Sequence, residues 1–556
     1  MKRPLLIALY FIFALAATAD NRTISQMKEI ASKKLSMYAN GNSVTRTTQN
    51  IVLIADEPTL SVFADQNGYV IVSRDKRFPE ILAYGMGDFN MEEAPTNVRW
   101  WYENIQKSLE TCQTLSTRSD ISYQPVAPML TTKWGQNTPY NNYAPTFTPN
   151  KVKAPIGCVA VSMGQVMNFN QYPASAKFTG SYMLDGENEQ HIVEVNSTYR
   201  WPYLLAYNDY IDDNGKLISV LTNPGQSNMV AALLRDCGYS VNMNYSVSGS
   251  GAIAAYAADA LVNCFGYPED AVKYRNRQFY TDEEWENMIY GELQKGFPII
   301  YNGNDANGGG GHSFIAHGMD GNGLLYINWG WNGMYDGYYE YRLLNPNPQQ
   351  FSLQQDIIYG IRKEALESDN YESMLGGELY SFDYDNAKGE FIVNSKGFYN
   401  YGGLDIIGRI AVVAENQTAP NKSVYIDFME QGDTLGGFWG FGKFTEKINI
   451  TFPKGQYHLY IASLDQRETN WQPVRTITDG AIYYGMEVDS DGTVTIGKTT
   501  NEFATAVDFV KNNNAAFENN NAPIRYYDLQ GREVDSSAKG LIIVRQGDMV
   551  KKVIRH

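Results

Sequence analysis

The sequence predicts an α+β protein of several domains that ends in an all-β region. Three observations support this prediction. The residues after Cys158 place apolar side chains at helical spacing. The stretch that begins at His312 reads as a strand, and the turn at 320–323 leads to a second strand-like run. From residue 371 onward, short β-type runs alternate with turns, which is typical of a β-sandwich.

The first element is a targeting segment, residues 1–19. A basic start at Lys2 and Arg3 precedes a short apolar run and a small-x-small site that ends at Ala19, which is typical of a secretory signal peptide. The apolar run is too short to remain as a transmembrane anchor, and we expect no other transmembrane segment. We therefore expect the chain to be exported.

Residues 20–123 read as a small α+β unit. The elements expected in it are helices over 23–38 and around 98–103 and strands over 51–55 and 69–73. The polar, aperiodic stretch 116–126 is a good site for proteolysis, so we expect the mature protein to begin near Gln124. The unit is either an inhibitory propeptide or an ordinary N-terminal domain that is retained.

Cys158 is the candidate nucleophile. It stands at the start of a predicted helix, after Pro155 and Gly157, which keep the preceding chain out of that helix. The free N–H groups of a first helical turn lower the pKa of a thiol and can hold a developing oxyanion. Since a free cysteine is otherwise a small buried residue, the assignment depends on a base elsewhere in the chain.

His312 is the candidate base. It follows a run of four glycines that ends at Gly311, where backbone can approach a substrate closely. A thiol and an imidazole are the two parts of a cysteine nucleophile site, whereas the alternative for His312 is a surface loop histidine. His317 lies five residues further along the same strand and therefore faces the other way. We expect His317 to be a hydrogen-bonded residue, and the two histidines are not expected to share a metal.

The strand-like run 324–328 should return beside His312. That arrangement places Asn328 and Trp329 where an amide carbonyl or an indole could orient the imidazole. Trp329 and Trp331 are alternatively core aromatics.

The C-terminal part divides into a β-sandwich over 371–500, an asparagine-rich linker over 512–521 and a short hairpin-rich module over 522–556. The β-sandwich is either an accessory domain for adhesion or substrate docking, or a rigid spacer.

Composition excludes several classes of partner. Acidic residues outnumber basic ones by 61 to 45, a net charge of −16, which argues against nucleic acid or an anionic membrane. The cysteines Cys112, Cys158, Cys237 and Cys264 match no metal-binding spacing, so neither a metal nor another cofactor is expected. Cys237 and Cys264 could pair, but their apolar helical contexts favour buried thiols.

These residues together resemble the streptopain family of secreted bacterial cysteine peptidases. The resemblance covers about residues 20–363, and several motifs occur in the family's order. The matching segments are 67–84, Gln136–Asn141, Gly157–Ala160, Gln171–Pro173, Gly311–Phe314 and Asn328–Trp331. At His317 the family has an acidic residue, so the local hydrogen bonding there is expected to differ.

The resemblance implies a papain-like, two-part cysteine peptidase over 124–365, preceded by an inhibitory propeptide over 20–123. It gives Gln136 the role of oxyanion donor, together with the backbone N–H of Cys158. It also places a substrate-cleft loop at 242–251. The residues expected to contact substrate are Ser246, Ser248, Ser250, Gly311 and Trp331; a Ser/Gly stretch such as 246–251 is otherwise a flexible loop. The module over 522–556 resembles C-terminal sorting modules of Bacteroidetes secreted proteins, which would attach the protein to the cell surface.

We therefore expect a secreted or cell-surface bacterial cysteine endopeptidase, made as a zymogen, that acts on proteins or peptides and is held inactive by its own propeptide. Two alternatives stay open: an acyl transferase or amidase that uses the same two residues, and a surface binding protein built on a degenerate protease scaffold.

Overall fold

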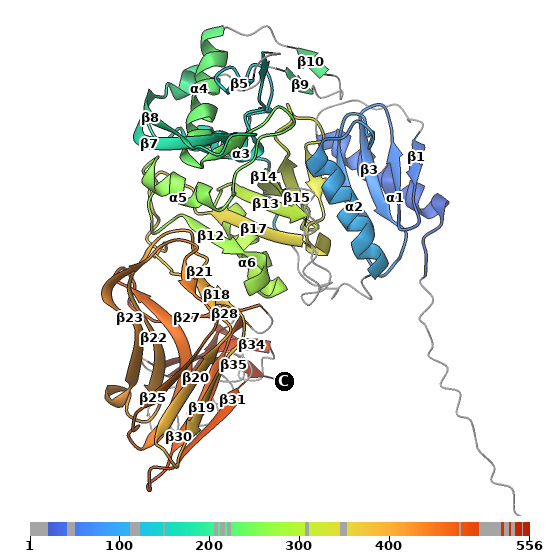
Figure 1. Cartoon of the computed structure of the whole chain (residues 1–556). Helices are drawn as coiled ribbons and strands as arrows, with labels where there is room; N and C mark the ends of the chain where they lie inside the picture. The colour runs from blue at the N-terminus through green and yellow to red at the C-terminus, as the bar shows by residue number, and fades with distance from the viewer. Residues whose placement is uncertain are drawn as a thin grey trace, which may run out of the picture. The chain divides into compact units, whose positions relative to one another are not determined.

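The computed structural model forms two compact units, Met1–Tyr267 with Glu286–Lys363 and Pro268–Trp285 with Glu364–His556. The elements are labelled in Figure 1. The described residues are 20–41, 51–111, 123–147, 151–204, 209–211, 217–219, 224–305, 311–344, 353–477, 480–499, 524–527, 533–534, 540–546 and 549–555. The expected signal peptide, the asparagine-rich linker, Cys112 and the glycines before Gly311 lie outside them. In the part of the chain that is described, no helix is long and apolar enough to cross a membrane.

The first unit begins with helix α1 (Ile24–Gly41), which packs on a sheet of four strands. A capping box starts the helix, because the Thr23 N–H donates to Gln26 Oε1 (2.9 Å) and the Gln26 N–H donates to Thr23 Oγ1 (3.3 Å). Met27, Ala31 and Leu35 then form the buried stripe of the helix. The strands are β1 (Val52–Asp56), β2 (Leu60–Ala64), β3 (Gly68–Ser73) and β4 (Ile81–Met86), and helix α2 (Thr96–Thr111) follows.

This sheet continues into the strand that carries His312. β4 pairs with β16, where Tyr84 lies opposite Tyr338, and the order runs β1-β2-β3-β4-β16-β15-β14-β13-β17. The added strands are β13 (Ile299–Asp305), β14 (Gly311–Met319), β15 (Leu325–Asn328), β16 (Gly337–Tyr339) and β17 (Leu353–Tyr359). The N-terminal region and the His312 strand therefore share one sheet.

Helix α3 (Cys158–Asn170) packs against β14 and against helix α4 (Pro224–Ser240). Gly164 lets α3 and α4 approach closely, because an added Cβ would lie 2.4 Å from Leu234 Cδ2. A separate sheet has the order β11-β7-β8. The remaining elements near this core are β7 (Ser175–Leu184), β8 (His191–Thr198), β11 (Met243–Tyr245), α5 (Tyr256–Asn263) and α6 (Asp282–Gln294); short pieces are β5 (Thr146–Phe147), β6 (Val152–Lys153), β9 (Asp209–Ile211) and β10 (Leu217–Ser219).

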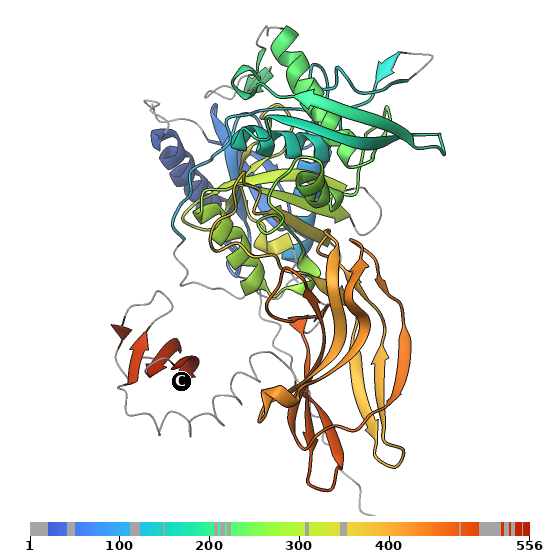
Figure 2. The ribbon, with the colours of Figure 1, turned by 90° about the vertical axis from the view of Figure 1, so that its left-hand side faces the viewer.

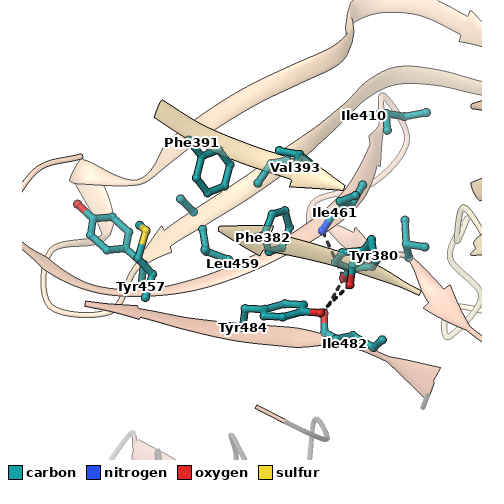
Figure 3. Close-up of a cluster of buried hydrophobic side chains, with 14 of the residues drawn as sticks. Tyr380, Phe382, Phe391, Val393, Ile410, Tyr457, Leu459, Ile461, Ile482 and Tyr484 are labelled. Atoms are coloured by element: carbon teal, nitrogen blue, oxygen red, sulfur yellow. Dashed lines mark hydrogen bonds between the residues drawn. The ribbon is translucent and has the colours of Figure 1, made fainter. Parts of the chain in front are cut away.

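The second unit is built almost entirely of strands, which Figure 2 shows in two facing layers. Its largest sheet has the order β23-β22-β26-β30-β31, and β19-β20-β25 forms another. The core between them is rich in aromatic rings (Figure 3), and the Tyr380 hydroxyl there donates to the Ile482 carbonyl at 2.6 Å. The main strands are β18 (Leu375–Gly377), β19 (Tyr380–Asp385), β20 (Glu390–Ser395), β21 (Phe398–Asn400), β22 (Ile406–Asn416), β23 (Val424–Leu435), β25 (Phe444–Asn449), β26 (Gly455–Asp465), β30 (Tyr483–Val488) and β31 (Val494–Thr499).

Residues 268–285 belong to the second unit although they precede the last part of the first unit in sequence. Ion pairs hold this segment there: Arg467–Glu269 and Arg475–Glu284 each measure 2.7 Å. At the C-terminal end, β32 (Ile524–Tyr527), β33 (Glu533–Val534), β34 (Gly540–Gln546) and β35 (Met549–Arg555) pair in the order β33-β32-β34-β35.

Candidate active site

Cys158 is the first residue of α3, as the sequence predicts. Gly157 caps the helix with φ 94°, a left-handed value that favours glycine. The space around Gly157 is also closed, because an added Cβ would lie 2.7 Å from Met243 Sδ. The half-buried thiol is therefore presented from a fixed turn at the N-terminus of the helix.

The fold brings Cys158 to the strand of His312. The Cys158 sulfur accepts a hydrogen bond from the backbone N–H of Ser313, the residue directly after His312. Burial raises the pKa of the thiol, while this bond and those from the N–H groups of Val159 and Cys158 act in the opposite direction. The start of α3 thus lies against the start of β14, the strand that carries His312.

His312 lies near the start of β14, half-buried and opposite Gly303 on β13. Burial lowers the pKa of its imidazole to about 4. With a raised thiol pKa and a lowered imidazole pKa, the neutral thiol and the neutral imidazole are the favoured forms at neutral pH.

Gln136 lies beside the approach to the nucleophile. Its carbonyl accepts a hydrogen bond from the Ile156 N–H at 2.9 Å, two residues before Cys158. The neighbouring Gly135 is packed tightly, since an added Cβ would lie 2.4 Å from Asn332 Oδ1. The half-buried Gln136 thus sits close to the helix start, as the predicted oxyanion role requires, and that role stays a prediction.

Asn328 is the last residue of the returning strand β15 and lies opposite Ile315 on β14, and Trp329 directly follows it. Both are buried, and the hydrogen bonds of the Asn328 amide go to Gln165, Thr132 and Gly330. The Trp329 indole packs on Phe314 and Tyr339, with ring centroids 4.7 and 5.0 Å away. Trp329 is thus a core aromatic, the alternative role that the sequence analysis gave for it. The orientation of His312 by Asn328 or Trp329 stays a prediction.

The expected substrate loop lies next to the nucleophile. Ser250 Oγ donates to the Pro155 carbonyl at 2.6 Å, three residues before Cys158. Ser246 Oγ donates to Asp185 Oδ2 at 3.0 Å and lies 3.0 Å from Ser248 Oγ. The loop is therefore held by its own serines. Of the other two residues predicted to contact substrate, Gly311 is exposed at the start of β14 and Trp331 is half-buried just after β15.

His317 is buried and accepts hydrogen bonds at Nδ1 from the backbone N–H groups of Met129 (3.1 Å) and Leu130 (3.2 Å). A carboxylate could accept the same two bonds, which explains how a histidine replaces the acidic residue expected there. Cys237 and Cys264 are free thiols. Within the described ranges, no three His, Cys, Asp or Glu side chains are grouped as a metal site.

Helix α2 of the N-terminal region covers the same strands. The Trp100 ring fills the space over Gly303, where an added Cβ would lie 2.4 Å from Trp100 Cη2. Asn97 Nδ2 donates to the Trp329 carbonyl at 2.9 Å, and Trp101 Nε1 donates to the Glu340 carbonyl at 2.8 Å. These contacts were not predicted from the sequence, although the two adjacent tryptophans of a short amphipathic helix were a signal of an anchoring surface.

A cysteine at a helix start, a histidine on the adjacent strand and an N-terminal helix laid over that strand define a cysteine peptidase with an inhibitory N-terminal region. Comparison with known protein families supports this class of protein. Residues 134–339 match the Peptidase C10 family, and residues 8–109 match the Spi protease inhibitor family. The chain belongs to the Peptidase C10 family.

Two relatives show how far the similarity extends. Streptopain of Streptococcus pyogenes is 30% identical over 304 residues, which cover 50% of this chain and 73% of streptopain. Thiol protease/hemagglutinin PrtT of Porphyromonas gingivalis is 26% identical over 426 residues, 71% of this chain; the match spans 46% of the length of PrtT. A solved fragment of Prevotella intermedia prointerpain A is 29% identical, with TM-score 0.49, and the alignment covers 57% of this chain and all of the fragment.

The predicted family and the α+β class with an all-β C-terminal part are therefore confirmed, as is the class of protein, a cysteine peptidase with an N-terminal inhibitor. The fold brings together Cys158, His312, Gln136 and the 246–250 loop. It directs the Asn328 amide toward Gln165, a residue that the sequence reading did not single out.

Proposed function

We propose that this protein is a secreted cysteine endopeptidase that is synthesised as a latent precursor. The observation that supports the proposal is the hydrogen bond from the Ser313 N–H to the Cys158 sulfur, because it joins a helix-start thiol to the residue directly after His312. His312 takes the thiol proton as the sulfur attacks the scissile carbonyl, and it returns that proton to the leaving amine. Water then hydrolyses the acyl-enzyme.

The oxyanion of the tetrahedral intermediate is held by the Cys158 backbone N–H at the start of α3 and by the Gln136 side-chain amide. Preorganised donors of this kind are worth a factor of roughly 10²–10³ each in kcat. The bond between Ile156 and Gln136 supports this assignment, because it fixes the Gln136 backbone next to the turn that presents the thiol.

The N-terminal region acts as the inhibitor. Trp100 on α2 covers Gly303, which lies opposite His312 on β13, and Asn97 on the same helix donates to the carbonyl of Trp329, which directly follows β15. A helix in this position blocks access to His312 and excludes water from it. Cleavage in the segment between α2 and Val126 would separate the inhibitor from the enzyme.

The test compares Cys158→Ala with Cys237→Ala, a matched control that removes a free thiol outside the site. Purified protein from both variants and from wild type is incubated with casein, and the secreted chains are subjected to N-terminal sequencing. We expect Cys158→Ala to abolish both casein digestion and self-processing, while Cys237→Ala retains both. Casein digestion by matured Cys158→Ala protein would refute the mechanism.

Export through the segment 1–19 and surface attachment through the module 522–556 are part of the proposal. Cell fractionation of the full chain and of a chain that ends before residue 522 tests them. The full chain should stay with the cells and the shortened chain should appear in the medium. An equal distribution would refute surface attachment through this module.

A further inference from the structure

Gln165 is a buried amide on the helix of the nucleophile. It lies seven residues after Cys158, which is two turns further along the same face of α3. Its side chain is fully buried, and the residues around it on the helix, such as Met163 and Val166, are apolar and buried as well. A buried amide must find hydrogen-bond partners, so the contacts of Gln165 show what it holds.

Gln165 forms a reciprocal amide pair with Asn328. Gln165 Nε2 donates to Asn328 Oδ1 at 3.2 Å, and Asn328 Nδ2 donates to Gln165 Oε1 at 3.3 Å. Gln165 Oε1 also accepts the backbone N–H of Trp134 at 3.2 Å. One side chain on α3 thus bonds to two other segments of the site.

Asn328 also forms hydrogen bonds with two segments other than α3. Its Nδ2 donates to the Thr132 carbonyl at 3.0 Å, and its Oδ1 accepts the Gly330 N–H at 3.0 Å. Thr132 and Trp134 lead directly into Gln136, and Gly330 precedes Trp331. The amide pair therefore joins the helix of Cys158, the segment of Gln136 and the turn after β15.

We infer that Gln165 is a positioning residue that sets the oxyanion donor Gln136 relative to the Cys158 sulfur. The inference rests on the proposed function and adds to it a residue that touches neither substrate nor the reacting atoms. Since a misplacement of about 1 Å can lower a rate by roughly 10²-fold, loss of the pair should act on catalysis and not only on stability.

The primary test is Gln165→Met, which keeps the length of the side chain and removes its polar atoms. Full-length protein is allowed to mature, and active sites are counted with a thiol-directed peptide epoxide. Per active site, kcat should fall by about 10-fold to 100-fold while KM changes by less than about 3-fold. Inhibition by a peptide aldehyde, whose adduct with the thiol needs the oxyanion donors, should weaken by the same factor as kcat/KM. Alkylation of Cys158 by iodoacetamide, which does not use them, should keep its rate.

The matched control is Asn170→Leu, which removes an amide at the other end of the same helix. Asn170 Nδ2 donates to the Val166 and Ile361 carbonyls, away from the Gln136 segment. This variant should keep wild-type kcat per active site. A Gln165→Met enzyme with wild-type kcat per active site and unchanged aldehyde inhibition would overturn the inference, whereas a wild-type protein without thiol-dependent peptidase activity would instead overturn the proposed function.

Gln165→Glu answers the question if the methionine variant does not fold. An ionised glutamate still accepts from Trp134 but cannot donate to Asn328, whereas a protonated glutamate can do both. Burial raises the pKa of a carboxyl at this fully buried position above its ordinary value of about 4.3, so the ratio of the kcat of Gln165→Glu to that of wild type should fall as the pH rises and the carboxyl ionises. A ratio of one at every pH would overturn the inference.

Discussion

Replacing Trp100 by alanine should release the latent state of the precursor. The Trp100 side chain is 6% exposed, covers Gly303 and lies 6.5 Å from the Phe314 ring, centroid to centroid. Removing a buried tryptophan side chain costs about 3–5 kcal/mol. We take the lower figure. Since each 1.4 kcal/mol is a factor of ten, the fraction of precursor with an open site should rise roughly 100-fold.

The assay follows labelling of Cys158 by a thiol-directed peptide epoxide in the uncut precursor band. The epoxide needs an open cleft, so its apparent rate is proportional to the open fraction. Trp100→Ala should therefore be labelled roughly 100-fold faster than wild type, and Trp100→Phe, which keeps a ring, should fall between them. Lys107→Ala, which changes an exposed residue of the same helix, should label at the wild-type rate.

Two results would contradict this reasoning. If Trp100→Ala and wild-type precursor were labelled at equal rates, the ring would not hold the site closed. If Lys107→Ala accelerated labelling as much as Trp100→Ala, general weakening of α2 would explain the effect, and the contact over Gly303 would have no special part in latency.

Three further predictions follow from neighbouring contacts. Gly303→Ala should also accelerate epoxide labelling, because the new Cβ would lie 2.4 Å from the Trp100 ring. In a Trp100→Ala background the same substitution should add little to the labelling rate. Additive effects of the two substitutions would show that the two residues act separately. Iodoacetamide should alkylate Cys158 at a more alkaline pH in the precursor than in the matured enzyme, since burial raises the thiol pKa; equal midpoints would contradict this. His317→Ala leaves the half-buried Leu130 N–H without its ring acceptor and removes one of the two acceptors of the Met129 N–H, which also donates to the His317 carbonyl. The substitution should lower the free energy of unfolding by about 1–3 kcal/mol, measured by urea titration. Burial lowers the pKa of His317 to about 3, below the value of about 6.5 in the unfolded chain. The stability that the neutral ring contributes is therefore fully present above pH 6.5 and is lost as the pH falls toward 3. Between these pH values, wild type should lose more stability than His317→Ala does.

Local sequence signals were sufficient for the elements that carry the catalytic groups. The helix expected after Cys158 is α3, and the strand expected to return beside His312 is β15, Leu325–Asn328. In the N-terminal region the helix expected over 23–38 is α1, whereas β2 and β4 were not predicted. Burial does not separate these two strands from the predicted β3, which is buried along its whole length as well. β3 differs in its continuous run of aromatic and β-branched residues, Tyr69–Val72, which is itself a strand signal.

The partners of each residue could not be predicted in the same way. The pairing of β4 with β16 and the packing of Trp100 over Gly303 join segments more than two hundred positions apart in the sequence. Gln165 was not singled out, because α3 carries several other polar residues, and its role depends on Asn328 and Trp134, which come from other segments. Such roles follow from the assembled fold and not from periodicity.

The contacts of α2 link inhibition to the chemistry of the nucleophile. Burial raises the pKa of Cys158 and lowers that of His312, and both shifts favour the uncharged pair that cannot attack a carbonyl. Trp100 covers Gly303, the strand residue opposite His312, and we expect its ring to contribute to this burial. When the N-terminal region leaves, we expect water to reach both groups and both pKa values to move back toward their ordinary ranges. Removal of one helix would then open the cleft and favour the thiolate–imidazolium pair in the same step, so that latency needs no separate chemical block on the thiol.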